Sequence, residues 1–161
     1  MNVARFLQPH RIYRPAGPVV CRYTTNAGQS ILNNTPAILN FEDLDFDTHS
    51  CVTTGANWKW TWPAPGFAEI YVKVMLEATS QWAVGSDYGN LSLYKGGNFV
   101  SNIAFTDYYG GGSQYATLKG FDRIRGVTGE YIDIRIRQTS GVTLAVTNDG
   151  TLNYITIELK Q

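Results

Sequence analysis

Hydrophobic residues alternate with polar ones along much of this chain, at the period of two that is typical of β-strands with one buried face. The alternation is clearest in Glu130–Thr139, where three isoleucines occupy every second position. Phe67–Thr79 and Tyr154–Lys160 repeat the pattern. No stretch keeps a 3.6-residue period over three turns, so the sequence predicts an all-β protein.

Turn residues separate the predicted strands. Gly96-Gly97 lies between Leu91–Tyr94 and Phe99–Ile103 and predicts a hairpin. Asn148-Asp149-Gly150 predicts a turn before the last strand. Eight or so strands at this spacing predict an antiparallel β-sandwich. The other predicted strands are Val19–Thr25, Pro36–Phe41, Trp58–Trp62 and Gln114–Lys119.

The N-terminal part differs from the rest in composition. Prolines at positions 9, 15 and 18 disfavour a helix or a central strand, and no acidic residue precedes Glu42. We therefore expect an extended basic arm over residues 1–30 and the sandwich over residues 31–161. A basic arm on an acidic body favours an acidic protein surface as its target. The arm residues expected to contact that partner are Arg5, Phe6, Leu7, Arg11, Ile12, Tyr13 and Arg14.

Charge and hydropathy narrow the classes of partner. The chain has 13 basic and 13 acidic residues, so a general affinity for nucleic acid is not indicated. The N-terminus lacks the apolar core of a signal peptide, and no apolar run approaches the ~20 residues of a membrane span. We expect a protein made in a cytoplasm, with neither nucleic acid nor membrane as partner.

The order of three segments resembles a known family. Trp60-Thr61-Trp62-Pro63-Ala64-Pro65-Gly66-Phe67 joins an aromatic strand to a long Tyr/Val strand through a Pro/Gly corner. Leu91-Ser92-Leu93-Tyr94-Lys95-Gly96-Gly97 and Gly129-Glu130-Tyr131-Ile132-Asp133-Ile134 follow in the expected order. Together, over roughly residues 35–161, they resemble the C1q and tumour-necrosis-factor-like jelly rolls.

The resemblance implies a homotrimer. No collagen-like stalk precedes the predicted domain, and Leu152-Asn153-Tyr154-Ile155 stands where the family often has Phe-x-Gly-Phe. A short Pro-rich arm joined to such a domain resembles small structural proteins of tailed bacteriophages. These occur as decoration (cement) trimers on capsids or as tip domains on fibres.

Candidate metal and catalytic residues are few. Asp43, Asp45 and Asp47 would share one face of a strand, with Leu44 and Phe46 buried opposite, and carboxylates suit calcium. This is a weak calcium candidate, since three acids on an exposed face are more often only solvated. No other metal and no cofactor is predicted.

Soft ligands and nucleophiles do not form a motif. The two histidines, His10 and His49, and the two cysteines, Cys21 and Cys51, lack the spacing of a zinc site or a nucleophile–base pair. Whether the cysteines pair is left open. The thirteen acids offer no glycosidase pair to nominate, so no catalytic residue is predicted and the chain is expected not to be an enzyme. Gly110–Gly112 lacks a P-loop lysine and is interpreted as a flexible loop.

Aromatic residues supply the remaining candidates. Trp58, Trp60 and Trp62 share one face, which favours core or subunit contact over a sugar-stacking platform. Trp82 and Tyr88, near a glycine, are possible glycan contacts. Three tyrosines lie opposite the aliphatic faces of separate strands and are predicted to form the trimer interface. They are Tyr71, Tyr131 and Tyr154.

These observations lead to two hypotheses about function. In the first, the chain is a virion structural protein, a homotrimeric decoration protein on the capsid exterior whose arm binds the major capsid protein or another virion protein. In the second, it is a receptor- or glycan-binding module at the tip of a fibre or tail.

Overall fold

The computed structural model describes residues 17–82, 86–107 and 113–161. Within these residues there are thirteen strands and no helix. The strands are β1 (Val19–Thr24), β2 (Ser30–Ile31), β3 (Ala37–Ile38), β4 (Asp43–Asp47), β5 (Val52–Thr53), β6 (Lys59–Thr61), β7 (Gly66–Thr79), β8 (Tyr88–Lys95), β9 (Asn98–Asp107), β10 (Gln114–Gly126), β11 (Tyr131–Gln138), β12 (Leu144–Ala145) and β13 (Tyr154–Lys160).

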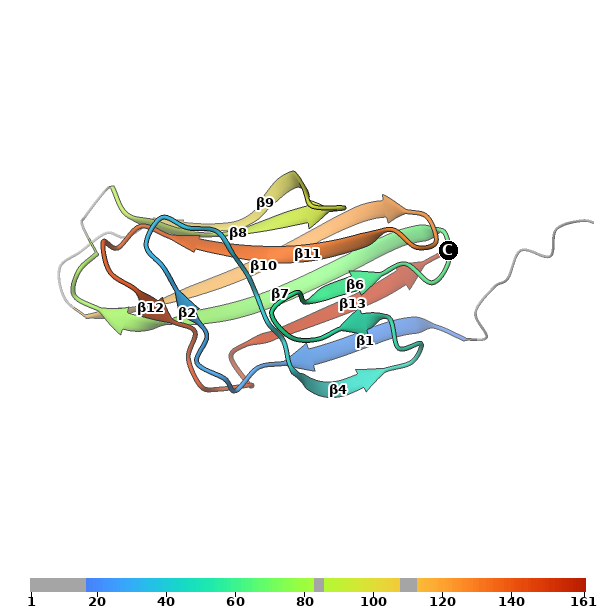
Figure 1. Cartoon of the computed structure of the whole chain (residues 1–161), viewed down its shortest axis with the longest axis horizontal. Coiled ribbons are helices and arrows are strands. Elements are labelled where there is room, and N and C mark those ends of the chain that lie inside the picture. The colour runs from blue at the N-terminus through green and yellow to red at the C-terminus, as the bar shows by residue number, and fades with distance from the viewer. Residues whose placement is uncertain (1–16, 83–85, 108–112) are drawn as a thin grey trace, which may run out of the picture.

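Two antiparallel sheets form the body of the molecule. One has five strands in the order β10-β7-β13-β1-β4, and the other runs β5-β6-β11-β8-β9 with β3 added beside β11. Figure 1 shows them stacked, with β11 in front of the paler β10 and β7. Consecutive strands such as β6 and β7 lie in different sheets, which confirms the predicted jelly-roll sandwich.

The core lies between the sheets and follows the alternation read from the sequence. In β7 every second residue from Ala68 to Leu76 is fully buried, and their neighbours face outward. Ile132, Ile134 and Ile136 of β11 face them from the other sheet, and all three are 0% exposed. Burying each such aliphatic side chain contributes about 1.5–3 kcal/mol to stability, so these facing rows hold the two sheets together.

The three tryptophans of the aromatic segment lie in the core. Trp58, Trp60 and Trp62 are at most 1% exposed, which confirms core packing over a sugar platform. The rings of Trp60 and Trp62 meet edge to face, with centroids 4.8 Å apart. Gly126, at the end of β10, lies directly against Trp62: a Cβ at this position would sit 2.2 Å from Cε2 of the indole. The packing of β10 against Trp62 therefore requires glycine at residue 126.

The predicted turn at Asn148-Asp149-Gly150 is held by a buried amide. Asn153 is 0% exposed, and its Nδ2 donates to the carbonyl oxygens of Thr147 and Asp149 at 2.6 and 3.0 Å. Its Oδ1 accepts from the backbone N–H of Met75 in β7 at 2.8 Å. One side chain thus satisfies the turn and fixes it to the sheet.

The boundary expected between residues 30 and 31 is wrong. β1 begins at Val19 and is a full member of the five-stranded sheet, pairing with β13 from Val19↔Leu159 to Thr24↔Tyr154. Its alternation buries Val19, Cys21 and Tyr23, so the sandwich starts twelve residues earlier than expected. The prolines end at Pro18, which explains why a strand forms directly after it.

A pair of glycine substitutions tests the close contact between Gly126 and Trp62. Gly126→Ala should destabilise the protein by about 1–3 kcal/mol, because its methyl group overlaps the Trp62 indole. Gly89→Ala is the control: this glycine is also buried in a strand, but its added Cβ would meet Leu118 at an ordinary 3.4 Å. Its effect should stay within about 1 kcal/mol, and urea unfolding measures both. Equal effects of the two changes would contradict the packing described for Trp62.

Candidate functional site

The three aspartates of β4 have separate roles. Asp43 accepts hydrogen bonds from the backbone and side-chain nitrogens of Asn26, and Asp45 forms an ion pair with Arg22 at 3.0 Å. Asp47 accepts from the backbone N–H groups of Cys51 and Val52 and so holds the loop after β4. Among the described residues no cluster of three acidic, histidine or cysteine side chains could hold a metal ion.

The expectation that Leu44 and Phe46 are buried opposite these aspartates is wrong. They are 62% and 42% exposed. β4 is the edge strand of its sheet, and its register with β1 shifts between Arg22 and Tyr23. Such an irregularity breaks the alternation of buried and exposed residues on which the expectation relied. As an edge strand, β4 also has a neighbouring strand on one side only, so its side chains are less covered.

Cys21 and Cys51 are both free thiols and both buried. Burial first, and then the negative charge of Asp47, raise the pKa of Cys51 from 9.0 to about 11. The same two causes raise the pKa of Cys21 as well. Both thiols therefore stay protonated at neutral pH and are poor nucleophiles.

The tyrosines predicted at a trimer interface are divided between the two sheets. Tyr71 of β7 and Tyr154 of β13 lie together on the outer face of the five-stranded sheet, with ring centroids 5.8 Å apart. Tyr131 lies on β11, in the other sheet. One flat interface cannot contain all three tyrosines, because they lie on opposite sides of the sandwich. The sequence could not show this, since alternation distinguishes the buried face of a strand from its outer face but does not identify the sheet that the strand joins.

The outer face of the five-stranded sheet carries exposed aromatic rings, and we name it the aromatic face. Its central cross-strand row runs across all five strands. The guanidinium of Arg22 in this row lies 4.2 Å from the ring centroid of Tyr154 in the neighbouring row. Exposed rings beside an arginine are the composition enriched in protein interfaces. From β10 to β4 the central row is Phe121, Tyr71, Thr156, Arg22 and Phe46, and its three aromatic residues are 62%, 40% and 42% exposed.

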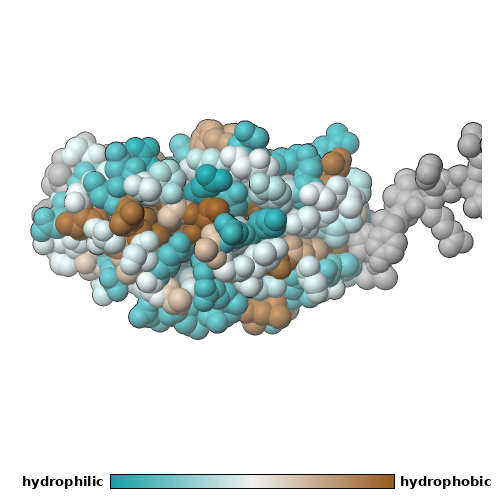
Figure 2. Space-filling model, viewed as in Figure 1, coloured by the Kyte–Doolittle hydropathy of each residue, from teal (hydrophilic) through white to brown (hydrophobic). Residues whose placement is uncertain are grey.

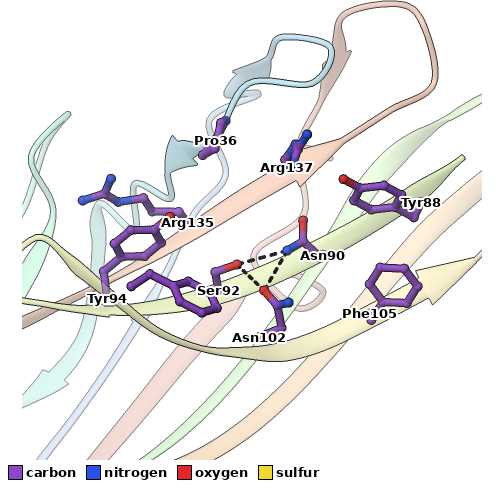
Figure 3. A pocket seen from close by; sticks show the side chains of 10 residues that line it. Pro36, Tyr88, Asn90, Ser92, Tyr94, Asn102, Phe105, Arg135 and Arg137 are labelled. Atoms are coloured by element: carbon purple, nitrogen blue, oxygen red, sulfur yellow. Dashed lines mark hydrogen bonds between the residues drawn. The ribbon is translucent and has the colours of Figure 1, made fainter.

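A groove of about 310 Å³ lies on the outer face of the six-stranded sheet. Strand register forms it, because β11, β8 and β9 pair side by side and place nine outward side chains in three rows. Figure 3 shows most of these side chains from close by. The rows are Arg137–Asn90–Phe105, Arg135–Ser92–Asn102 and Asp133–Tyr94–Phe99.

Hydrogen bonds fix the floor of the groove. Nδ2 of Asn90 donates to Oγ of Ser92 at 3.0 Å and to Oδ1 of Asn102 at 3.1 Å, and the Ser92 hydroxyl donates to the same Asn102 oxygen at 2.8 Å (Figure 3). Asn90 and Ser92 are each 8% exposed. Oδ1 of Asn90 is buried and accepts no hydrogen bond from any described group.

Aromatic rings form the walls of the groove. Tyr88 and Phe105 are stacked, with centroids 5.2 Å apart and planes 24° from parallel. Tyr94 and Phe99 meet edge to face at 5.8 Å. Phe99 and Phe105 are more than half exposed, so each keeps ring surface that a ligand can contact.

The glycan contacts predicted from the sequence are thereby corrected in part. Trp82 is only 5% exposed, so its ring belongs to the core and cannot lie flat against a surface sugar. Tyr88, in contrast, lines the groove.

Seen from the side drawn in Figure 2, most of the surface is polar or of intermediate hydropathy, and apolar residues form small separate groups.

Two sequence predictions fall outside the described residues. The partner-contacting residues of the arm all precede Gly17, where the structure begins to describe the chain, and the glycine loop at residues 110–112 lies in the gap after Asp107. Both stay predictions. In the described ranges, no helix is long and apolar enough to span a membrane.

Comparison with known proteins shows the fold. No family model and no curated protein matches the sequence. Among solved structures, Eiger TNF from S. frugiperda superposes with a TM-score of 0.66 at 10% identity, covering 89% of this chain and 93% of that chain. Murine APRIL gives 0.61 at 9% identity, covering 89% and 100%. The globular domain of zebrafish complement 1qA protein gives 0.58 at 12%, covering 88% and 95%.

This chain has a TNF/C1q-like jelly-roll fold. The likeness confirms the fold expected from the sequence, and at these identities it shows the fold alone. The sequence could not reveal the groove, since only the β8–β9 pairing follows from a local signal, the Gly96-Gly97 hairpin. The pairing of β8 with β11 joins segments about forty residues apart, for which no local signal exists.

Replacing aspartates tests the separate roles of the β4 carboxylates. Asp47→Ala should cost about 1–3 kcal/mol, because it leaves the backbone donors of Cys51 and Val52 without their acceptor. Asp45→Ala removes only an exposed ion pair with Arg22 and should cost less than about 1 kcal/mol. Urea unfolding with and without calcium chloride measures both. If calcium stabilises the wild-type protein but neither variant, the separate roles are contradicted and the hypothesis of a calcium site at β4 is supported.

Proposed function

We propose that this chain is a virion structural protein, a homotrimeric decoration (cement) protein held on the capsid exterior through its N-terminal arm. The aromatic face is the observation that carries the proposal. In an isolated subunit its rings face water, and contiguous exposed apolar surface of this kind commonly marks a protein interface. A second copy of the chain is the partner we propose for it.

The composition of the aromatic face suits self-association. Phe121 and Tyr71 are opposite each other in the β10–β7 register and expose apolar surface, while Arg22 and the Tyr154 hydroxyl supply polar contacts. Flat sheet faces of this kind can pack around a symmetry axis, and closed rotational symmetry gives an assembly of fixed size. A threefold axis is proposed from the jelly-roll fold.

The proposed role of the arm follows from where the sandwich begins. Gly17 and Pro18 precede β1 at the end of the molecule where the C-terminus also lies (Figure 1). Three arms of one trimer would therefore leave from the same end. Attachment through three arms multiplies avidity, because the second and third contacts are intramolecular. The proposed partner is the major capsid protein or another virion protein.

The groove on the six-stranded sheet favours a second candidate function, a receptor- or glycan-binding module. It lies on the sheet opposite the aromatic face, so a trimer built on that face would leave it open. The two candidates differ in copy number: a decoration protein covers a shell, whereas a fibre tip is present in few copies.

The oligomer tests the first proposal. Sedimentation equilibrium should give three times the 17.9 kDa chain mass. Phe121→Glu should dissociate the assembly while the β-sheet circular-dichroism spectrum is kept, because a charge would be desolvated in the interface. Phe105→Glu is the matched control, a ring 56% exposed on the opposite sheet, and should leave the mass unchanged. A monomeric wild-type protein, or an assembly unaffected by Phe121→Glu, contradicts the proposed interface.

Deletion of residues 1–16 tests the arm. The truncation keeps Pro18, whose carbonyl accepts a hydrogen bond from Oγ1 of Thr48 at 2.9 Å, so the sandwich should remain intact. The shortened protein should still assemble but should no longer bind capsids from which the protein has been removed, as counted by electron microscopy. Full decoration by the shortened protein would rule out the arm as the anchor.

A further inference from the structure

We propose that the groove formed by β11, β8 and β9 binds a saccharide that carries a carboxylate. The proposal deepens the second candidate function and is independent of the oligomeric state. It rests on three features of the groove: a stacked aromatic platform, a floor of fixed amides with a free acceptor, and an arginine without a carboxylate partner.

The aromatic platform suits the apolar face of a sugar ring. A pyranose presents axial C–H groups on one face and hydroxyl groups around its rim. Phe105 is 56% exposed and is held by stacking on Tyr88, so its open ring is positioned before any ligand arrives. Fixed aromatic rings with few rotatable bonds lose little entropy when they bind a ligand.

The floor supplies hydrogen-bonding groups for the hydroxyl rim. Oδ1 of Asn90 is buried without a donor from any described group, and Figure 3 shows it directed toward the side where Arg137 and Tyr88 lie. An unsatisfied buried acceptor is costly, so a molecule outside the chain is expected to donate to it: water in the free protein and a ligand hydroxyl in the complex. Asn102 is exposed, and its Nδ2 makes no hydrogen bond within the described residues. The floor therefore offers one acceptor and one donor that a sugar hydroxyl can pair with.

The charge of the groove selects an acidic sugar. Arg135 is neutralised by Asp133, with Nε 2.7 Å from Oδ1, and its guanidinium lies 3.8 Å from the ring centroid of Tyr94. Arg137 has no carboxylate partner in the described part of the chain; its contacts are the side-chain oxygen of Asn34 and the ring of Tyr88. One positive charge beside the platform therefore remains to pair with a ligand carboxylate.

A peptide ligand fits the groove less well. Peptides that add to a β-sheet use the free backbone groups of an edge strand. The groove instead lies on a sheet face, and the backbones of β8 and β11 pair on both sides with neighbouring strands. Only side chains therefore face a ligand in the groove. The volume of the groove, about 310 Å³, suits one or two sugar rings.

Two carboxylated trisaccharides and one neutral disaccharide test the inference. The full chain is titrated with 3′-sialyllactose, with lactose and with tri-galacturonic acid, and binding is followed by saturation-transfer NMR and calorimetry. We expect at least one carboxylated probe to bind about tenfold or more tightly than lactose, as a charge-assisted contact from Arg137 implies. Phe105→Ala should weaken that probe about tenfold or more. Arg137→Gln should abolish the preference over lactose.

Two variants outside the groove serve as controls. Val127→Ala removes an exposed apolar group in the β10–β11 turn, and Arg125→Gln removes an exposed charge near the end of β10; both variants should bind like the wild type. Circular dichroism and the melting temperature establish that each variant is folded. The inference is overturned if no carboxylated sugar binds, if Phe105→Ala and Arg137→Gln bind like the controls, or if only an acidic peptide such as oligoglutamate binds. None of these outcomes depends on sedimentation, so failure here leaves the proposed trimer standing.

Discussion

The two sheets stack because their central strands direct aliphatic side chains to one side, as β7, β11 and β13 do. Ile70, Val72, Val74 and Leu76 alternate with outward residues along β7, and the isoleucines of β11 and β13 meet them in the core. A shift of one residue in any of these strands would turn its whole buried set toward water. The register is therefore fixed by burial, and with it the position of every outward side chain.

The two outer faces follow from that register and differ in chemistry. On the five-stranded sheet, the register of β10, β7 and β1 aligns Phe121, Tyr71 and Arg22 in an exposed row that suits contact with another protein. On the six-stranded sheet, the register of β11, β8 and β9 surrounds the amides of Asn90 and Asn102 with rings and arginines. One face is suited to association and the other to a small polar ligand. A single chain can combine both roles, because the core separates the two faces.

Much of the fold could be predicted from the sequence, because burial leaves a local record. The strands at Phe67–Thr79 and Tyr154–Lys160 agree with β7 and β13 to within one residue, and the three tryptophans lie in the core as expected. The sequence also predicted the Gly96-Gly97 hairpin. It failed at β4, where the irregular register of an edge strand exposes Leu44 and Phe46.

The candidate site was less accessible to sequence reasoning. Tyr88 was predicted as a possible glycan contact and lines the groove, but its partner Phe105 lies seventeen residues away on β9, and Arg137 comes from β11. Trp82 was predicted as a possible glycan contact as well, yet it is buried. Non-local pairing decides which outward side chains become neighbours, and alternation alone contains no information about it. The separation of Tyr131 from Tyr71 and Tyr154 has the same cause.

The central claim is that the aromatic face is covered in the assembled protein while the groove stays open. Hydroxyl-radical footprinting with mass spectrometry tests both parts in one measurement, on the full chain at concentrations above and below assembly. We predict that oxidation of Tyr71 and Phe121 falls on assembly, whereas Phe99 and Phe105 remain as reactive as in the dilute protein. Unchanged oxidation of Tyr71 and Phe121, or protection of Phe99 and Phe105 instead, would contradict the account.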